Sequence, residues 1–143
     1  MRGVVSTKLE PFLQQANQAT EEAKLTGTAF NPDTIRENLN KLAPLIGQGP
    51  KLEIVRDVNF TFEDHLIPAR VYGSASKQPM PVVIHYHGGG HMAGSLELYD
   101  PICRRVAESG QCIVLSVEYR LAPEHPYPAG VDDCQHVSRH YRQ

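Results

Sequence analysis

The chain has 143 residues, 41% of them hydrophobic, which is enough for one domain with a core and too few for two domains of ordinary size. Its formal net charge is −2 and its charged residues are interspersed, which argues against nucleic acid and anionic membrane surfaces as partners. Met1–Pro11 lack the apolar core of a signal peptide, and no run reaches the roughly 18 apolar residues of a membrane span, which predicts a cytoplasmic protein.

Two amphipathic helices are predicted before the first strand. Apolar residues recur at helical spacing over residues 9–23, until Thr26-Gly27 ends the pattern. A second helix is expected to begin at Pro32 with Asn31 as its N-cap, because proline suits the first helical position and asparagine accepts hydrogen bonds there. Pro44 is expected to end this helix.

The following segment predicts an antiparallel pair of strands. Apolar and polar residues alternate over residues 54–62, and a second strand is expected over Leu66–Tyr72, bounded by Gly73-Ser74. Alternation is typical of a sheet with one face in water. Pro68 is expected to lie on an edge strand or at a bulge, because proline has no N–H to donate to a neighbouring strand.

Two later apolar runs indicate a parallel sheet. Val82–Ile84 and Ile113–Leu115 are continuously apolar, as central strands covered on both faces must be. Between them, Asp100 as the N-cap, Pro101 and Gly110 delimit a helix of about ten residues, so that the segment predicts a βαβ unit. Apolar residues at helical spacing predict a last helix before the C-terminus, namely Val131, Cys134, Val137 and Tyr141.

The most informative motif is a run of glycines directly after the first of these apolar strands. Residues 82–94 read VVIHYHGGGHMAG, so that the strand leads into Gly88, Gly89 and Gly90. Glycines can take positive φ and leave backbone N–H groups unshielded, and in acyl transfer such amides stabilise the tetrahedral oxyanion. His-Gly-Gly-Gly at this place is the oxyanion motif of α/β-hydrolase lipases and esterases. Neither phosphate-binding glycine spacing is present.

A second segment extends the motif to a family. Residues 116–133 read SVEYRLAPEHPYPAGVDD and resemble the segment that follows the glycine loop in hormone-sensitive-lipase-type (HGGG) esterases and lipases. The resemblance covers about residues 50–140 and implies an α/β protein, the incomplete N-terminal portion of an α/β-hydrolase fold. Residues 1–48 would be N-terminal cap helices, and residues 49–143 a partial core domain with an antiparallel strand pair followed by βαβ.

The resemblance also implies roles for individual residues. The amides of Gly88–Gly90 would form the oxyanion hole, and His87 would support the loop rather than act as the catalytic base. His91 and Met92 would line the substrate pocket, where His91 replaces a residue that is usually bulky and apolar or aromatic in this family and makes one wall more polar.

The nucleophile of the family lies in a Gly-x-Ser-x-Gly motif, which does not occur in the 143 residues. Ser95 lies near the glycine loop but lacks the flanking glycines, and it is interpreted as a loop residue. The chain is therefore expected to be truncated before the nucleophile and inactive alone. It would supply the oxyanion loop of a carboxylic-ester hydrolase whose full-length relative takes a small acyl ester.

Two kinds of partner and one alternative function accompany this prediction. The chain is expected to associate with itself or with a complementing C-terminal portion, because an unfinished sheet exposes an edge. The alternative is a non-catalytic ligand-binding or self-associating module of the same fold, like relatives that resemble the plant gibberellin receptor.

The remaining histidines, cysteines and charges give no further chemistry. No metal and no cofactor are expected, because His136 and His140 form no His-Glu-x-x-His motif, Val137 standing in place of the glutamate. The three cysteines are scattered and odd in number, which favours reduced, inert thiols. Arg120 and Glu124 are expected to form a buried structural pair.

Overall fold

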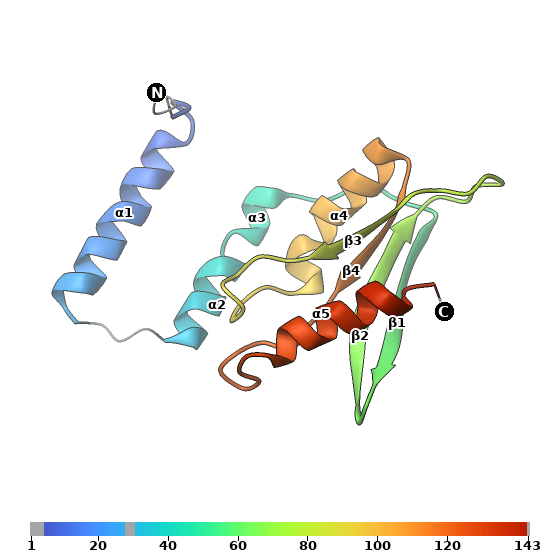
Figure 1. Ribbon diagram of the computed structural model, residues 1–143. Coiled ribbons are helices and arrows are strands. Elements are labelled where there is room, and N and C mark those ends of the chain that lie inside the picture. The colour runs from blue at the N-terminus through green and yellow to red at the C-terminus, as the bar shows by residue number, and fades with distance from the viewer. Residues whose placement is uncertain (1–4, 28–30, 143) are drawn as a thin grey trace. The chain divides into compact units, whose positions relative to one another are not determined.

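A computed structural model describes residues 5–27 and 31–142 (Figure 1). Residues 1–4 lie outside the described residues, and so does Gln143. The prediction that Met1–Pro11 lack the apolar core of a signal peptide therefore falls partly outside the described residues. The chain forms two compact units, Met1–Asn31 and Pro32–Gln143. The division of function between residues 1–48 and 49–143 stays a prediction.

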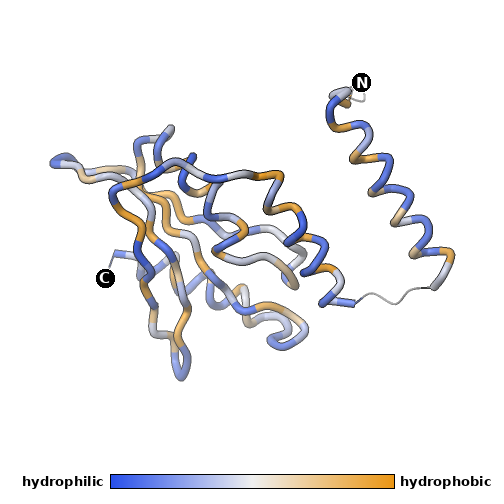
Figure 2. The backbone as a smooth tube through the Cα atoms, turned by 180° about the vertical axis from the view of Figure 1, so that it is seen from behind, coloured by the Kyte–Doolittle hydropathy of each residue, from blue (hydrophilic) through white to orange (hydrophobic). Residues whose placement is uncertain are grey.

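The first unit contains one helix, as the sequence predicts. α1 spans Glu10–Leu25 and has Pro11 in its first turn, where the missing proline N–H would have no helical acceptor. Thr26 closes the helix, and its N–H donates to the Glu22 carbonyl at 2.9 Å. Figure 2 shows hydrophobic residues recurring among hydrophilic ones along α1, in the pattern of an amphipathic helix.

The second unit begins with two helices where one is predicted. α2 (Pro32–Asn40) starts at the predicted proline, but it ends before the chain reaches Pro44. Pro44 instead lies in the first turn of a short helix, α3 (Ala43–Ile46), so the prediction that it ends α2 is wrong. A proline fits there because the first N–H groups of a helix have no intrahelical partner.

β1 (Ile54–Phe62) and β2 (His65–Gly73) form the predicted antiparallel pair, joined by the turn Glu63-Asp64. The placement of Pro68 on an edge strand or bulge is wrong, because β2 lies between β1 and β4. The Pro68 carbonyl accepts a hydrogen bond from the Glu118 N–H at 2.9 Å, just beyond the last β2–β4 pair. The missing proline N–H therefore falls at the end of the ladder, where it disrupts little.

β3 (Val82–Tyr86) and β4 (Ile113–Val117) are parallel, as predicted, in a sheet of order β1-β2-β4-β3. β4 is an interior strand and is almost wholly buried. β3 is the last strand of the sheet among the described residues, and Val82 and Val83 are 42% and 41% exposed. The prediction of a central strand covered on both faces is thus confirmed for β4, whereas β3 has a partner on one side only among the described residues.

The helix between these strands, α4 (Leu96–Gly110), is longer than predicted. Its N-cap is Ser95, whose hydroxyl accepts a hydrogen bond from the Leu98 N–H at 3.2 Å, and not Asp100. Pro101 lies in the second turn of the helix, where it removes one backbone hydrogen bond and does not end the helix. The βαβ unit itself is confirmed.

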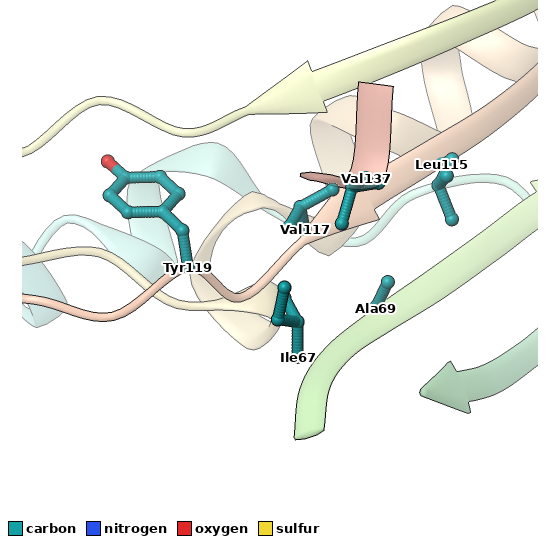
Figure 3. Close-up of a cluster of buried hydrophobic side chains, with 6 residues drawn as sticks. All are labelled: Ile67, Ala69, Leu115, Val117, Tyr119 and Val137. Carbon is teal, nitrogen blue, oxygen red and sulfur yellow. The ribbon is translucent and has the colours of Figure 1, made fainter. Parts of the chain in front are cut away.

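α4 and α5 (Ala129–His140) pack on opposite faces of the sheet, as Figure 1 shows. Successive residues of β4 point to opposite faces, so Val114 packs towards α4 while Leu115 packs towards α5. The core on the α5 face is drawn in Figure 3 and consists of Ile67, Ala69, Leu115, Val117, Tyr119 and Val137. A sheet between helices confirms the predicted α/β class.

Candidate active site

The glycine loop follows β3 and takes backbone conformations that favour glycine. Gly89 has φ of 134° and Gly90 has φ of 65°. A Cβ atom on Gly89 would overlap the carbonyl of Ala93, whereas a Cβ on Gly90 would have no neighbour within 4 Å. Gly89 is therefore required both by its φ and by close packing, and Gly90 by its φ alone.

The carbonyl groups of this loop are held by hydrogen bonds. The Gly89 carbonyl accepts from the N–H groups of Met92 and Ala93 at 3.2 and 3.0 Å, which closes a tight turn. The His91 carbonyl accepts from the Ala122 N–H at 2.9 Å, and the Met92 carbonyl accepts from Arg36 Nε at 2.8 Å. These bonds fix the peptide planes of the turn.

The amide groups of the same loop have no such partners. The N–H groups of Gly88, Gly89 and Gly90 donate to no acceptor in residues 5–27 and 31–142. Gly88 and Gly90 are exposed and Gly89 is partly exposed. The loop thus presents three free N–H donors beside carbonyls that are engaged at Gly88, Gly89, His91 and Met92, an arrangement that suits an anion.

His87 lies at the base of this loop with its ring fixed on both faces. The ring is buried and stacks on Tyr119 at 4.5 Å and on Tyr99 at 5.5 Å between centroids. Its Nδ1 is 3.0 Å from the Gly88 carbonyl, which can only accept, so Nδ1 carries the hydrogen of this bond. Nε2 is buried and has no partner among the described residues.

Gly94 makes room for this ring. It has φ of 111°, and a Cβ atom there would overlap Nδ1 of His87 and come within 2.7 Å of the Gly88 carbonyl oxygen. The Tyr119 hydroxyl also donates to the His87 carbonyl at 2.6 Å. The imidazole is therefore packed beneath the loop, held by its neighbours rather than free in a cleft.

The two predicted pocket residues are placed differently. His91 is exposed, with φ of 60°, and borders an open cavity of about 330 Å³ between the end of β3 and α5. Met92 is half-buried and does not border this cavity. The lining residues are Tyr86, His91, Gly130, Val131, Cys134, Gln135, Ser138 and Arg139. Burial raises the pKa of the Cys134 thiol to about 11, so it is not an activated nucleophile.

The prediction that Arg120 and Glu124 form a buried pair is wrong. Arg120 instead binds the fully buried carboxylate of Asp133, with Nη2 at 2.8 Å and its backbone N–H at 2.9 Å. Glu124 binds Arg36 in α2, with two oxygens at 2.9 and 2.7 Å from the guanidinium. Glu124 lies in the Pro-rich segment between Arg120 and α5, whereas Asp133 lies on α5 itself, which places its carboxylate beside Arg120.

Sequence reasoning missed both of the true partners. A signal for Asp133 existed, because Gly130, Asp133 and Val137 share the buried face of α5 and a carboxylate on that face needs a cation. For Arg36 we find no such signal, since it lies on a polar part of α2 and its partners are 56 to 88 residues away.

A second cluster of polar side chains lies beneath α4 and contains His85, Ser116 and Cys103. His85 Nδ1 lies 3.1 Å from Ser116 Oγ and 3.4 Å from Cys103 Sγ, beneath α4. Burial lowers the pKa of His85 and raises that of Cys103, so both groups are held neutral and do not form a thiolate–imidazolium pair.

In the described part of the chain, no three His, Cys, Asp or Glu side chains are grouped as a metal site requires. None of the described helices has the length and apolar character of a membrane span.

The chain is similar to several known proteins. A family model described as alpha/beta hydrolase fold matches residues 83–143. Carboxylesterase NlhH of Mycobacterium tuberculosis is 56% identical over 68 residues, which cover 47% of this chain and 21% of that protein. The arylesterase of Saccharolobus solfataricus is 35% identical over 128 residues, covering 88% and 42%. The solved structure of the Pyrobaculum calidifontis esterase gives a TM-score of 0.75 at 33% identity and covers 96% and 44%.

The chain spans less than half the length of each of these three relatives. Within that span the likeness extends from sequence to backbone, and it includes the whole segment from the glycine loop to α5. The chain therefore belongs to the hormone-sensitive-lipase-type carboxylesterase family of the α/β-hydrolase fold.

Proposed function

We propose that this chain supplies the oxyanion-binding part of a carboxylic-ester hydrolase. The observation that carries the proposal is the asymmetry of the glycine loop, in which the carbonyls of Gly88 and Gly89 accept hydrogen bonds while the N–H groups of Gly88, Gly89 and Gly90 have no acceptor in the described structure. Attack on an ester places negative charge on the carbonyl oxygen, and preorganised N–H donors stabilise that charge most in the transition state.

Each residue of the site has a role in this proposal. The amides of Gly89 and Gly90, with that of Gly88, bind the oxyanion of a small acyl ester. His87 supports the loop from below, because its ring is stacked between two tyrosines and bonded to the Gly88 carbonyl. His91 and Met92 form part of the acyl pocket, which His91 makes more polar.

The chain alone would not hydrolyse esters. No Gly-x-Ser-x-Gly motif occurs in the 143 residues, and Ser95 uses its hydroxyl to cap α4. We infer that a serine nucleophile and its base come from a C-terminal portion that complements this one. The isolated chain should therefore hydrolyse short-chain p-nitrophenyl esters no faster than a protein blank. Turnover that a serine-directed phosphonate abolishes would contradict this.

A chimera tests the proposed function directly. Residues 1–143 are joined to the part of carboxylesterase NlhH that follows its matched segment, and hydrolysis of p-nitrophenyl acetate is measured beside the NlhH part alone. We expect serine-dependent turnover in the chimera only. Gly90→Val should lower kcat by about a hundredfold with little change in KM, because the loop binds the transition state rather than the ground-state ester.

Gly27→Val is the matched control. Gly27 has φ of 60°, and a Cβ there would also meet nothing within 4 Å, so the backbone strain is similar while the position is remote in sequence from the glycine loop. An unchanged kcat in Gly90→Val would remove the loop from the mechanism. A chimera that folds but hydrolyses nothing would favour the alternative, a non-catalytic ligand-binding module.

A further inference from the structure

One side chain of α2 reaches three separate points around the glycine loop. Arg36 Nε donates to the Met92 carbonyl at 2.8 Å, and Nη2 donates to the Ala122 carbonyl at 3.1 Å. The remaining donors bind Glu124, with Nη1 to Oε1 at 2.9 Å and Nη2 to Oε2 at 2.7 Å. The guanidinium thus joins α2 to the segment after the glycines and to the segment after β4.

These contacts hold two segments that are themselves bonded to the glycine turn, one at Met92 and one at Ala122. The Met92–Ala93 peptide gives its carbonyl to Arg36 and its N–H to the Gly89 carbonyl. Ala122 gives its own carbonyl to Arg36 and its N–H to the His91 carbonyl. Arg36 therefore holds the Met92–Ala93 peptide, whose N–H binds the Gly89 carbonyl, and it holds the carbonyl of Ala122, the residue whose N–H binds the His91 carbonyl.

The chemistry of arginine suits this task. A guanidinium has five donors in a rigid planar fork, whereas a lysine ammonium is a single point on a flexible stem and cannot match the same three acceptors. The hydrogen bond from Arg36 lowers the pKa of Glu124 to about 2, so the carboxylate stays charged and keeps the fork oriented at ordinary pH. An exposed ion pair contributes little stability, which leaves orientation as its main effect.

We propose that Arg36 is a positioning residue, through which α2 fixes the oxyanion-binding conformation of the glycine loop. The role of Arg36 in catalysis rests on the proposed function. Its effect on the conformation of the glycine loop can be measured without turnover. Loss of the guanidinium should loosen the turn locally, while the sheet beneath it keeps its stability.

Amide hydrogen exchange of the 143-residue chain at submicromolar concentration, followed by mass spectrometry with fragmentation of the labelled peptides, tests this link. The reporters are the N–H groups of Ala93 and Ala122, which are bonded to Gly89 and His91, and the amides of β4 report on the core. Arg36→Met should speed exchange at Ala93 and Ala122 about tenfold or more and leave β4 unchanged. Arg36→Lys should give an intermediate change, since lysine can reach one acceptor.

Arg105→Met is the matched control, because Arg105 also binds two backbone carbonyls, those of Ile46 and Gln48, but away from the loop. It should leave Ala93 and Ala122 unchanged. Unaltered exchange at these two amides in Arg36→Met, an equal rise in β4, or no protection of them in the unsubstituted chain would each overturn the proposal. An inactive chimera would refute the proposed function and leave the exchange result standing.

Discussion

Gly94 and Gly90 lie in the same loop but differ in their surroundings, which predicts different costs for the same substitution. Gly90→Ala should cost about 1 kcal/mol of stability, because its left-handed backbone is strained for alanine while the space is open. Gly94→Ala should cost about 3 kcal/mol, because its Cβ would also displace the buried ring of His87. Urea denaturation measures both, and equal losses would mean that His87 is not fixed by Gly94.

The predictability of single residues depended on how far apart their partners lie in the sequence. The glycine loop could be predicted because an apolar strand and three glycines are contiguous. The partner of Arg120 was predicted wrongly because Glu124 is nearer in sequence, whereas the true partner, Asp133, approaches only after α5 has folded back. Arg36 could not be predicted, since nothing local marks a guanidinium that bonds to distant backbone carbonyls.

α5 is joined to the rest of the unit through the buried carboxylate of Asp133. It binds Arg120 and also accepts from His65 in β2, whose Nε2 is 3.0 Å away. Burial raises the pKa of Asp133, but the hydrogen bonds from the Arg120 side chain, its backbone N–H and His65 outweigh this and hold the pKa below its usual value. One carboxylate therefore ties a helix to a strand and to the loop after β4.

This link predicts how the stability of the unit depends on pH. Because the pKa of Asp133 is lower in the folded chain, its contribution is present above the unfolded value of about 3.9 and is lost as pH falls through the folded pKa. Asp133→Asn should cost about 3 kcal/mol at pH 7 and flatten this acid dependence, because Arg120 then lacks its counter-charge.

Urea denaturation between about pH 2 and pH 7, a range that extends below the usual aspartate pKa of about 3.9, measures both effects. Asp132→Asn is the control, since it removes the same charge at the neighbouring position, which acts on Arg120 only at longer range and forms no ion pair within the described residues. A pH dependence that survives in Asp133→Asn would assign the acid sensitivity to another group.

Elements were predicted well in kind and less well at their ends. The strand pair and the βαβ unit follow from period-2 alternation and continuous apolar runs, which are local signals. The start of α4 was missed because Asp100-Pro101 imitates an N-cap followed by the first helical residue, while Ser95 is the cap that forms. The position of β3 at the end of the sheet depends on which strands pair, and that is not a local property.

At the scale of the chain, β3 forms one edge of the sheet that the described residues build. Among the described residues β3 pairs only with β4, and Val82 and Val83 are about two-fifths exposed. Unpaired edges with apolar side chains recruit other strands. We expect the isolated chain to self-associate at micromolar concentration, which sedimentation velocity would detect.

Val83→Lys should weaken this association, because a lysine on an edge strand opposes pairing. Val106→Lys is the control, since Val106 is 42% exposed but lies on α4. A monodisperse monomer with a sharp thermal transition would show that the free edge does not associate and that the 143 residues are stable by themselves.

The strand order also governs the sequence of events by which the sheet assembles during synthesis. β1 and β2 are separated by a two-residue turn, so their hairpin closes at a small cost in chain entropy. β3 emerges next but has no place beside that hairpin, because its register partner for Val82 is Ile113, in a strand not yet made. Only when β4 has paired with β2 does β3 gain a template. An apolar strand must therefore wait unpaired while α4 is translated, and during this interval the nascent chain exposes an apolar strand that is prone to aggregation.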